Sequence, residues 1–231
     1  MHVKLKGWFQ LAFDLDFSIS LVAVMMIIVG LLIGSYLLGS IPFGLLIAKW
    51  WFGVDVREHG SGNIGATNVY RVVGKPAGVL VFTLDVLKGF LPPFIAAHFL
   101  HTSSTWQVLS GLCSIFGHSL SPFLGFKGGK SVATGLGVLF GLSWQTALAC
   151  FALWGVLLVI TGYVSVSSII AALASVPFII VFNPDDMPRV SIALAGSLLI
   201  LYRHRSNLKR LREGTETSIR KPKSKGDGKA S

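Results

Sequence analysis

Hydrophobic residues form three long stretches that contain no Asp, Glu, Lys or Arg. These stretches cover residues 17–48, 89–126 and 131–184, with lengths of 32, 38 and 54 residues. About 20 apolar residues are enough to cross a bilayer, so each stretch can hold at least one transmembrane helix. The pattern predicts an all-α integral membrane protein. The composition agrees, because 13% charged residues is about half the share usual in soluble domains.

Short polar breaks divide these stretches into about seven candidate spans. The first would be roughly 48 Å long as a single helix, which exceeds a hydrocarbon core of about 30 Å. It must therefore tilt, kink or project, and Pro42 is the expected kink. The fourth and seventh are short, so hydropathy alone accepts five to seven spans. The candidates are residues 18–48, 76–99, 106–124, 130–142, 144–162, 165–182 and 190–203.

Glycines and cysteines in the apolar stretches are expected to be structural. The pairs Gly30–Gly34 and Gly137–Gly141 have the four-residue spacing that lets helices approach closely. Cys113 and Cys150 lie within apolar segments, where a cysteine is usually a small buried side chain. Neither a disulfide framework nor a metal site is expected from them.

The charge is distributed unevenly along the chain. Residues 203–231 supply +7 of the net +10, and the other 202 residues supply +3. With seven spans, the cationic loops 51–75 and 124–130 share one side with this tail, which predicts an external N-terminus and a cytoplasmic C-terminus. A basic tail after a hydrophobic helix indicates anionic membrane lipid rather than nucleic acid as the partner.

The domain organisation expected from these features is simple. We expect an N-terminal extension at 1–17, one multi-pass membrane domain at 18–216 and a basic, disordered tail at 217–231. The first apolar run is longer than the roughly 7–15 apolar residues of a cleaved signal peptide.

The first polar cluster spans residues 59–71. Its glycines fit G-x-G-x-x-G, but no βαβ unit is available for a dinucleotide fold. Glycines still let backbone N–H groups converge on an anion, polar side chains can donate hydrogen bonds, and Arg71 can hold a phosphate with two N–H groups. A phosphate-binding loop is predicted, with an ordinary flexible loop as the alternative. The other residues assigned to it are Gly60, Ser61, Gly62, Asn63, Gly65, Thr67 and Asn68.

The second cluster precedes the fourth span. It resembles a nucleotide-binding P-loop, but Leu124 occupies the position of the required first glycine, which excludes an NTPase. A loop with two glycines and two lysines at a helix N-terminus still predicts an anion site, unless the lysines only serve orientation in the membrane. The residues assigned to it are Lys127, Gly128, Gly129, Lys130 and Ser131.

The third cluster, Arg203 to Asn207, follows the last span. His204 and Asn207 are three residues apart, so both can face one substrate from one side of a helix. The cations at the start of this tail are assigned to substrate phosphate.

Ionisable residues also occur within the spans. Asp85 and Lys88 are three apart, and their cost inside a membrane indicates a structural ion pair, with a polar cavity as the alternative. His118 either lines the same cavity or bonds to a backbone carbonyl. No group of His, Asp and Glu has ligand spacing, so neither a metal nor another cofactor is expected.

These clusters carry a specific resemblance. The segments Gly39–Gly44, Gly60–Arg71 and Gly117–Thr134 resemble the three signature motifs of the bacterial acyl-phosphate:glycerol-3-phosphate acyltransferases, the PlsY family, and Arg203–Glu216 resembles its C-terminal motif. The resemblance implies a seven-helix bundle in the bacterial inner membrane with its motifs at the cytosolic face. It implies acyl transfer from acyl phosphate to the 1-hydroxyl of glycerol 3-phosphate, giving lysophosphatidic acid and inorganic phosphate. No obligate protein partner is evident from the sequence. The residues it implies for binding and catalysis are Ser61, Arg71, Lys130, His204 and Asn207.

A conventional His–Asp base is not visible, because none of the six histidines has Asp five residues later. We therefore hypothesise that the donor's own phosphate accepts the hydroxyl proton. Lys130, Ser61 and loop N–H groups would stabilise charge while Arg71, His204 and Asn207 orient glycerol 3-phosphate.

Two other function classes use the same features. A transporter or channel for a phosphorylated metabolite would place its site near the membrane midplane, whereas the polar clusters here gather at one face. A purely structural bundle would leave the motifs unexplained.

Overall fold

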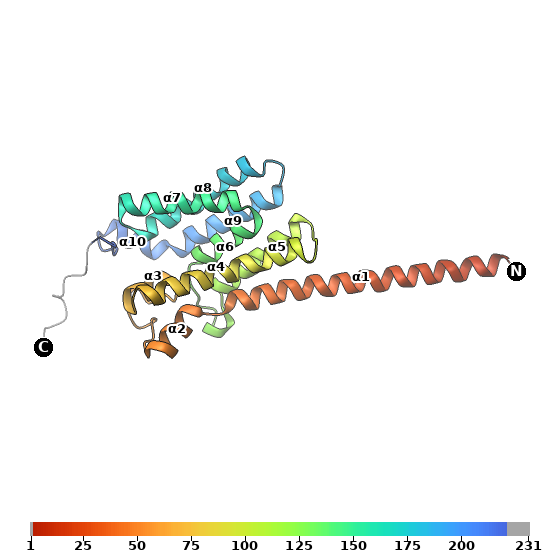
Figure 1. Cartoon of the computed structure of the whole chain (residues 1–231), viewed down its shortest axis with the longest axis horizontal. Helices are drawn as coiled ribbons and strands as arrows, with labels where there is room; N and C mark the ends of the chain where they lie inside the picture. The colour runs from red at the N-terminus through yellow and green to blue at the C-terminus, as the bar shows by residue number, and fades with distance from the viewer. Residues whose placement is uncertain (1, 221–231) are drawn as a thin grey trace.

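The computed structural model describes residues 2–220, with side chains from Leu21 onward. Over this range the chain forms ten α-helices and one short 3-10 helix (Figure 1). The helix α1 extends far beyond the bundle formed by the others. The elements are α1 His2–Ser40, α2 Phe43–Phe52, α3 Ala66–Val72, α4 Lys75–His98, α5 Ser104–Ser119, η1 Pro122–Leu124, α6 Val132–Leu142, α7 Trp144–Thr161, α8 Val164–Phe182, α9 Met187–Arg203 and α10 Arg205–Arg212.

All seven predicted spans correspond to helices, which confirms the all-helical class. By length and composition, four are able to cross a membrane: residues 21–40 of α1, and α4, α7 and α8. The helices α5, α6 and α9 are shorter, with 16, 11 and 17 residues. The predicted sidedness of the ends stays a prediction.

The first predicted span is wrong as a single helix over 18–48. The helix α1 ends at Ser40 and α2 begins at Phe43, because Pro42 has no N–H group and cannot continue the hydrogen-bond pattern. Side chains bind the carbonyls freed by this break: Lys88 Nζ donates to Ile41 O at 2.8 Å, and Ser121 Oγ donates to Ser40 O at 2.7 Å.

The predicted ion pair within α4 is confirmed. Lys88 Nζ lies 2.7 Å from Asp85 Oδ1, and both side chains are almost fully buried. Lys88 therefore neutralises a buried carboxylate and also donates a hydrogen bond to a backbone carbonyl that the break after α1 leaves free.

The two glycine pairs differ. A Cβ on Gly137 would lie 1.9 Å from the carbonyl oxygen of Val86, and one on Gly141 would lie 2.6 Å from Pro93, so these glycines let α6 pack directly on α4. A Cβ on Gly30 or Gly34 would meet nothing within 4 Å. The packing prediction is confirmed for the second pair and wrong for the first within the described chain.

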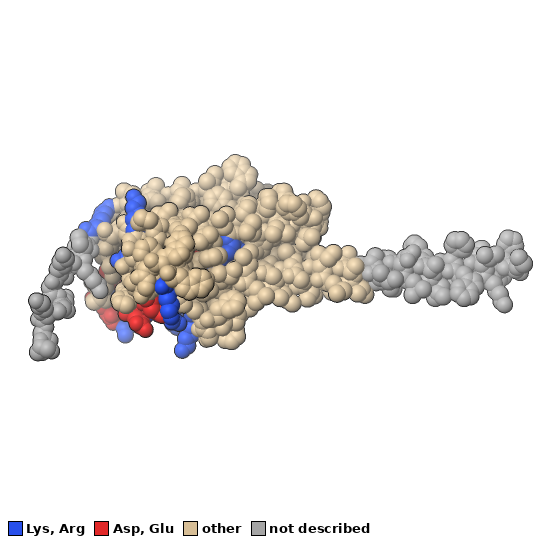
Figure 2. All heavy atoms as spheres, turned by 60° about the horizontal axis from the view of Figure 1, so that its bottom comes forward, with Lys and Arg blue, Asp and Glu red and all other residues tan. Residues whose placement is uncertain are grey.

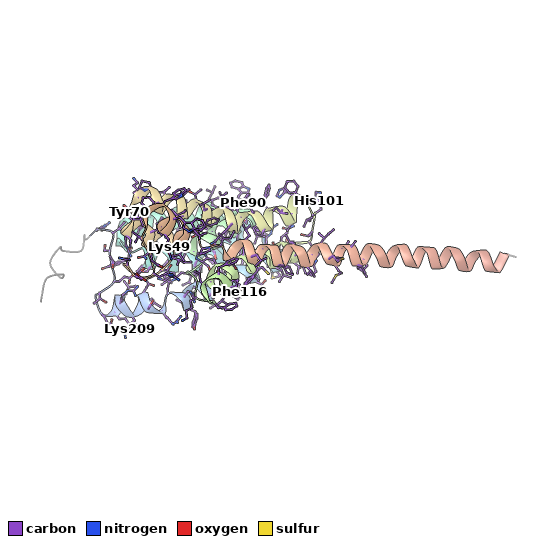
Figure 3. The ribbon with its side chains drawn as sticks, turned by 90° about the horizontal axis from the view of Figure 1, so that it is seen from below. Lys49, Tyr70, Phe90, His101, Phe116 and Lys209 are labelled. Carbon is purple, nitrogen blue, oxygen red and sulfur yellow. The ribbon has the colours of Figure 1, made fainter. Side chains whose placement is uncertain are left out.

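Charged side chains gather at one end of the bundle (Figure 2). Lys49, Tyr70 and Lys209 mark this end, and His101 marks the opposite one (Figure 3). We call residues 49–75, 125–131 and 203–220 the polar end.

The start of the tail folds back on the bundle. Ile219 N and Ser218 Oγ both donate to Gly162 O, at 2.9 and 3.2 Å. Residues 221–231 of the predicted basic tail lie outside the described residues, as does Met1 of the predicted extension. The backbone of the rest of that extension continues α1 as a helix. The domain boundaries stay predictions.

Candidate active site

A cavity of about 230 Å³ extends from the polar end into the bundle. Its lining is mostly polar at the polar end and mostly apolar along the helices, and along α9 it reaches from His204 to Ile192, which is about 18 Å at 1.5 Å per residue. The five predicted binding and catalytic residues all line it, although they come from three separate parts of the chain. The polar lining includes Ser61, Arg71, Lys130, His204, Asn207 and Glu216, and the apolar lining includes Phe82, Leu136, Leu139, Phe151, Trp154 and Ile192.

Lys130 and Asn207 are in direct contact. Lys130 Nζ donates to Asn207 Oδ1, and Asn207 Nδ2 donates to Glu216 Oε1 at 2.7 Å. Burial and the neighbouring charges of Arg210 and Arg71 lower the pKa of Lys130 to about 8. Lys130 is thus still a cation at neutral pH. Asn207 joins Lys130 to Glu216 instead of offering a free amide to a substrate.

Glu216 is a site residue that sequence reasoning did not assign. Its carboxylate accepts hydrogen bonds from Ser165 Oγ, Asn207 Nδ2 and Arg210 Nε, each at 2.7 Å. Burial raises the pKa of Glu216, but these hydrogen bonds and the charge of Arg210 outweigh burial and hold its pKa below the usual range. An ionised carboxylate therefore stabilises the cationic wall. The available signal was an acidic residue within a strongly basic tail.

The ring of His204 has a defined hydrogen-bond arrangement. Its Nδ1 lies 2.8 Å from the carbonyl oxygen of Ile200, and because a carbonyl only accepts, Nδ1 carries the proton and Nε2 of the neutral ring is an acceptor. Burial, followed by the positive charge of Lys130, lowers the pKa of His204 to about 4. His204 is thus neutral at physiological pH.

The loop before α3 is built by the side chains that we predicted to bind phosphate. Asn68 Oδ1 accepts from Ser61 N at 2.9 Å, and Asn68 Nδ2 donates to the carbonyls of Val56 and His59 at 2.9 and 3.1 Å. The prediction that Asn68 donates to an anion is therefore wrong, because asparagine side chains bond readily to nearby backbone.

Some of the other residues of this loop stabilise the loop itself, and others line the cavity. Asn63 Oδ1 accepts from Gly65 N at 2.8 Å, while Gly60 and Gly62 adopt left-handed backbone angles. Within the described residues, the hydroxyls of Ser61 and Thr67 bind no protein group, and both residues line the cavity. Arg71 also lines it and donates from Nη2 to Thr217 O at 3.0 Å.

In the loop of the second polar cluster, residues 127–131, most of the predicted anion donors bind the protein itself. The N–H groups of Gly128 and Gly129 donate to the carbonyls of Ser119 and His118, both at 3.0 Å, and are not free to bind an anion. Ser131 Oγ lies 2.6 Å from Ser119 Oγ and 3.0 Å from Ile115 O.

The anion-binding prediction is therefore wrong for Gly128, Gly129 and Ser131, because the N–H groups of the two glycines and the hydroxyl of the serine bind α5. Lys127 is exposed and does not line the cavity. Of the five residues predicted here, Lys130 and Ser131 line the cavity, and only Lys130 brings a charge to it.

Of the three residues given a possible place in the cavity, Asp85 and His118 line it, with Asp85 Oδ1 lying 3.7 Å from His118 Nδ1. Lys88 points to the α1–α2 break instead, so the cavity alternative is wrong for Lys88 and the favoured ion pair is confirmed.

Comparison with known proteins identifies the family. A family profile described as glycerol-3-phosphate acyltransferase matches residues 17–214. The glycerol-3-phosphate acyltransferase of Parasynechococcus marenigrum is 45% identical over 211 residues, covering 91% of this chain and 98% of the relative. That of Lactiplantibacillus plantarum is 42% identical over 192 residues, covering 83% and 92%.

Two solved structures agree with the fold. Crystal structures of PlsY (YgiH), an integral membrane glycerol 3-phosphate acyltransferase, are 46% identical to this chain in a glycerol 3-phosphate form and a lysophosphatidic acid form. Their TM-scores are 0.78 and 0.77, and they cover 83% of this chain and 95% and 94% of their own. The chain therefore belongs to the glycerol-3-phosphate acyltransferase family of integral membrane enzymes, the PlsY family.

Proposed function

We propose that this chain transfers a fatty acyl group from acyl phosphate to the 1-hydroxyl of glycerol 3-phosphate, giving lysophosphatidic acid and inorganic phosphate. The observation that carries the proposal is one cavity with a cationic wall at the polar end and an apolar interior. An acyl phosphate has the same two parts, and glycerol 3-phosphate adds a second phosphate at the polar end. The two similar crystal structures hold glycerol 3-phosphate and lysophosphatidic acid, which supports this acceptor and product.

The phosphates bind to Arg71 and Lys130, whose charged N–H groups line the polar part of the cavity. Arginine can hold a phosphate with two N–H groups, and a lysine ammonium acts as a point charge. Ser61 and Thr67 add hydroxyl donors. The acyl chain extends into the apolar part, which removes it from water and holds its carbonyl near the acceptor hydroxyl.

The donor's phosphate accepts the proton. The acceptor oxygen attacks the acyl carbon, the acyl carbon–oxygen bond to phosphate breaks, and the hydroxyl proton moves to the departing phosphate. A phosphate group with a second pKa of about 6 is a stronger base than His204, whose pKa is lowered to about 4. His204 therefore orients the hydroxyl through the acceptor Nε2, while Lys130 offsets the charge on the leaving group.

The polar end faces the cytosol of a bacterial inner membrane in this proposal. Its loops carry most of the cations of the chain, which matches the usual excess of Lys and Arg on the cytoplasmic side. Both substrates are charged, and their headgroups meet the protein at that side.

The test is purified protein with palmitoyl phosphate and glycerol 3-phosphate. We expect phosphate release that depends on both substrates, together with lysophosphatidic acid. Arg71→Ala should lose most of this activity. Arg57→Ala is the matched control, because Arg57 lies in the same part of the polar end but pairs with Asp55 and does not line the cavity.

Two results would contradict the proposal. Equal turnover with an acyl thioester in place of acyl phosphate would reject the donor. Flux of glycerol 3-phosphate across proteoliposomes without any product would favour the transporter alternative.

A further inference from the structure

Arg203, the last residue of α9, binds the loop that carries Lys130. Its Nε donates to Gly129 O at 3.0 Å, and its Nη2 donates to Gly128 O at 2.5 Å. Arg203 does not line the cavity. These N–H groups are therefore committed to the protein, which corrects the assignment of this cation to substrate phosphate.

The helix α5 holds the same loop from the other side. The N–H groups of Gly128 and Gly129 donate to carbonyls at the end of α5, and a Cβ on Gly129 would lie 2.1 Å from Nε2 of the buried His118. Two consecutive residues, Gly128 and Gly129, are thus bound through their N–H groups on one side and through their carbonyls on the other. We call the Arg203 contacts with Gly128 and Gly129 the Arg203 clamp.

The clamp connects two parts of the site that are about 75 residues apart in sequence. Lys130 directly follows the clamped glycines, and His204 directly follows Arg203. Asn207, one helical turn further along, accepts the hydrogen bond of Lys130. The spacing between these groups therefore depends on how the loop is seated against the end of α9.

We propose that Arg203 is a positioning residue, which acts through the carbonyls of Gly128 and Gly129 to place Lys130 relative to His204 and Asn207 and does not touch substrate. The inference rests on the proposed role of Lys130. It adds a residue that lies outside the cavity lining.

The chemistry of arginine explains why this position needs a guanidinium. Its planar fork presents N–H groups in a fixed geometry that matches two neighbouring carbonyl oxygens, whereas a lysine ammonium is a compact charge on a flexible stem. Arg203→Lys therefore keeps the charge and removes the paired contact, so it separates positioning from electrostatic attraction.

The experiment compares Arg203→Lys with Arg205→Lys. The sequence also assigns Arg205 to substrate phosphate, but Arg205 is exposed, does not line the cavity and stacks on Tyr202 at 4.6 Å, so that assignment is wrong. Arg205 is therefore the matched control. Amide hydrogen exchange is measured without substrate, and kcat/KM for glycerol 3-phosphate is measured separately. We expect Arg203→Lys to speed exchange in residues 127–131, with α7 and α8 unchanged, and to lower kcat/KM by about 10- to 100-fold, since a displacement of about 1 Å has effects of this order. Arg205→Lys should do neither.

Three results would overturn the inference. Unchanged loop exchange with reduced kcat/KM would mean that Arg203 acts directly on substrate. Faster exchange throughout the bundle would mean a general structural role, and full retention of kcat/KM would mean that charge alone suffices. If Arg203→Lys does not fold, Arg203→Gln removes the charge but retains one planar donor group, and faster exchange confined to residues 127–131 is again the expected result. Because exchange needs no turnover, failure of the clamp is distinguishable from failure of the proposed reaction.

Discussion

Lys130 is expected to set the upper pH limit of activity. Burial and the charges of Arg210 and Arg71 lower its pKa to about 8, and only the protonated form can bind a phosphate oxygen. The cation is therefore present below pH 8 and is lost as the pH rises through that value. We expect kcat/KM for glycerol 3-phosphate to be level between neutrality and about pH 8 and then to fall about tenfold per pH unit, as the loss of one proton requires.

Lys130→Arg tests this directly. A guanidinium keeps its proton up to a pKa of about 12 or more, so the profile of this variant should stay level to about pH 10, whatever its absolute rate. Lys127→Arg is the matched control, since Lys127 lies in the same loop, is exposed and does not line the cavity. It should keep the break near pH 8.

The assay is the initial rate of phosphate release in detergent at subsaturating glycerol 3-phosphate. Phosphate groups with a second pKa of about 6 are fully ionised above pH 7 and add no break of their own. A break near pH 8 that persists in Lys130→Arg would refute the assignment to Lys130. A wild-type profile that is level to pH 10 would also refute it.

Three further substitutions test the fold around the site. Glu216→Gln should lower stability by about 1–3 kcal/mol, because it neutralises a carboxylate that accepts three hydrogen bonds; an unfolding temperature in detergent no lower than that of the exposed-site control Glu213→Gln would contradict this. Lys88→Met should cost about 3–5 kcal/mol, because it leaves its ion-pair partner as a buried, unpaired charge; equilibrium unfolding in mixed micelles measures the loss, and wild-type stability would disprove it. Gly137→Leu should reduce the yield of monodisperse protein and Gly30→Leu should not, since only the first glycine faces backbone at contact distance; size-exclusion chromatography decides, and equal yields would count against the packing account.

The sequence by itself determined the membrane class and the residues that gather at the site. Long stretches without charge require helices that satisfy their own backbone hydrogen bonds in lipid. Successive helices run in opposite directions, so the polar loops that follow every second helix lie at the same end of the bundle. Ser61, Arg71, Lys130, His204 and Asn207 line one cavity for this reason. The break at Pro42 was also visible locally, since it follows from the missing N–H group, although the sequence suggested a kink and the structure has two helices.

Only the tertiary structure decided which polar groups face the cavity and which bind the protein itself. Asn68 and the N–H groups of Gly128 and Gly129 are competent anion donors, yet all are bound to neighbouring carbonyls. Glu216 and Arg203 gained their roles from contacts with residues far away in sequence. A hydrogen-bond donor binds whichever acceptor lies within reach, and that distance is set by helix packing. The glycine pairs show the same limit: identical spacing gave close packing at Gly137 and open surroundings at Gly30, because a small residue allows close approach but does not supply the neighbour.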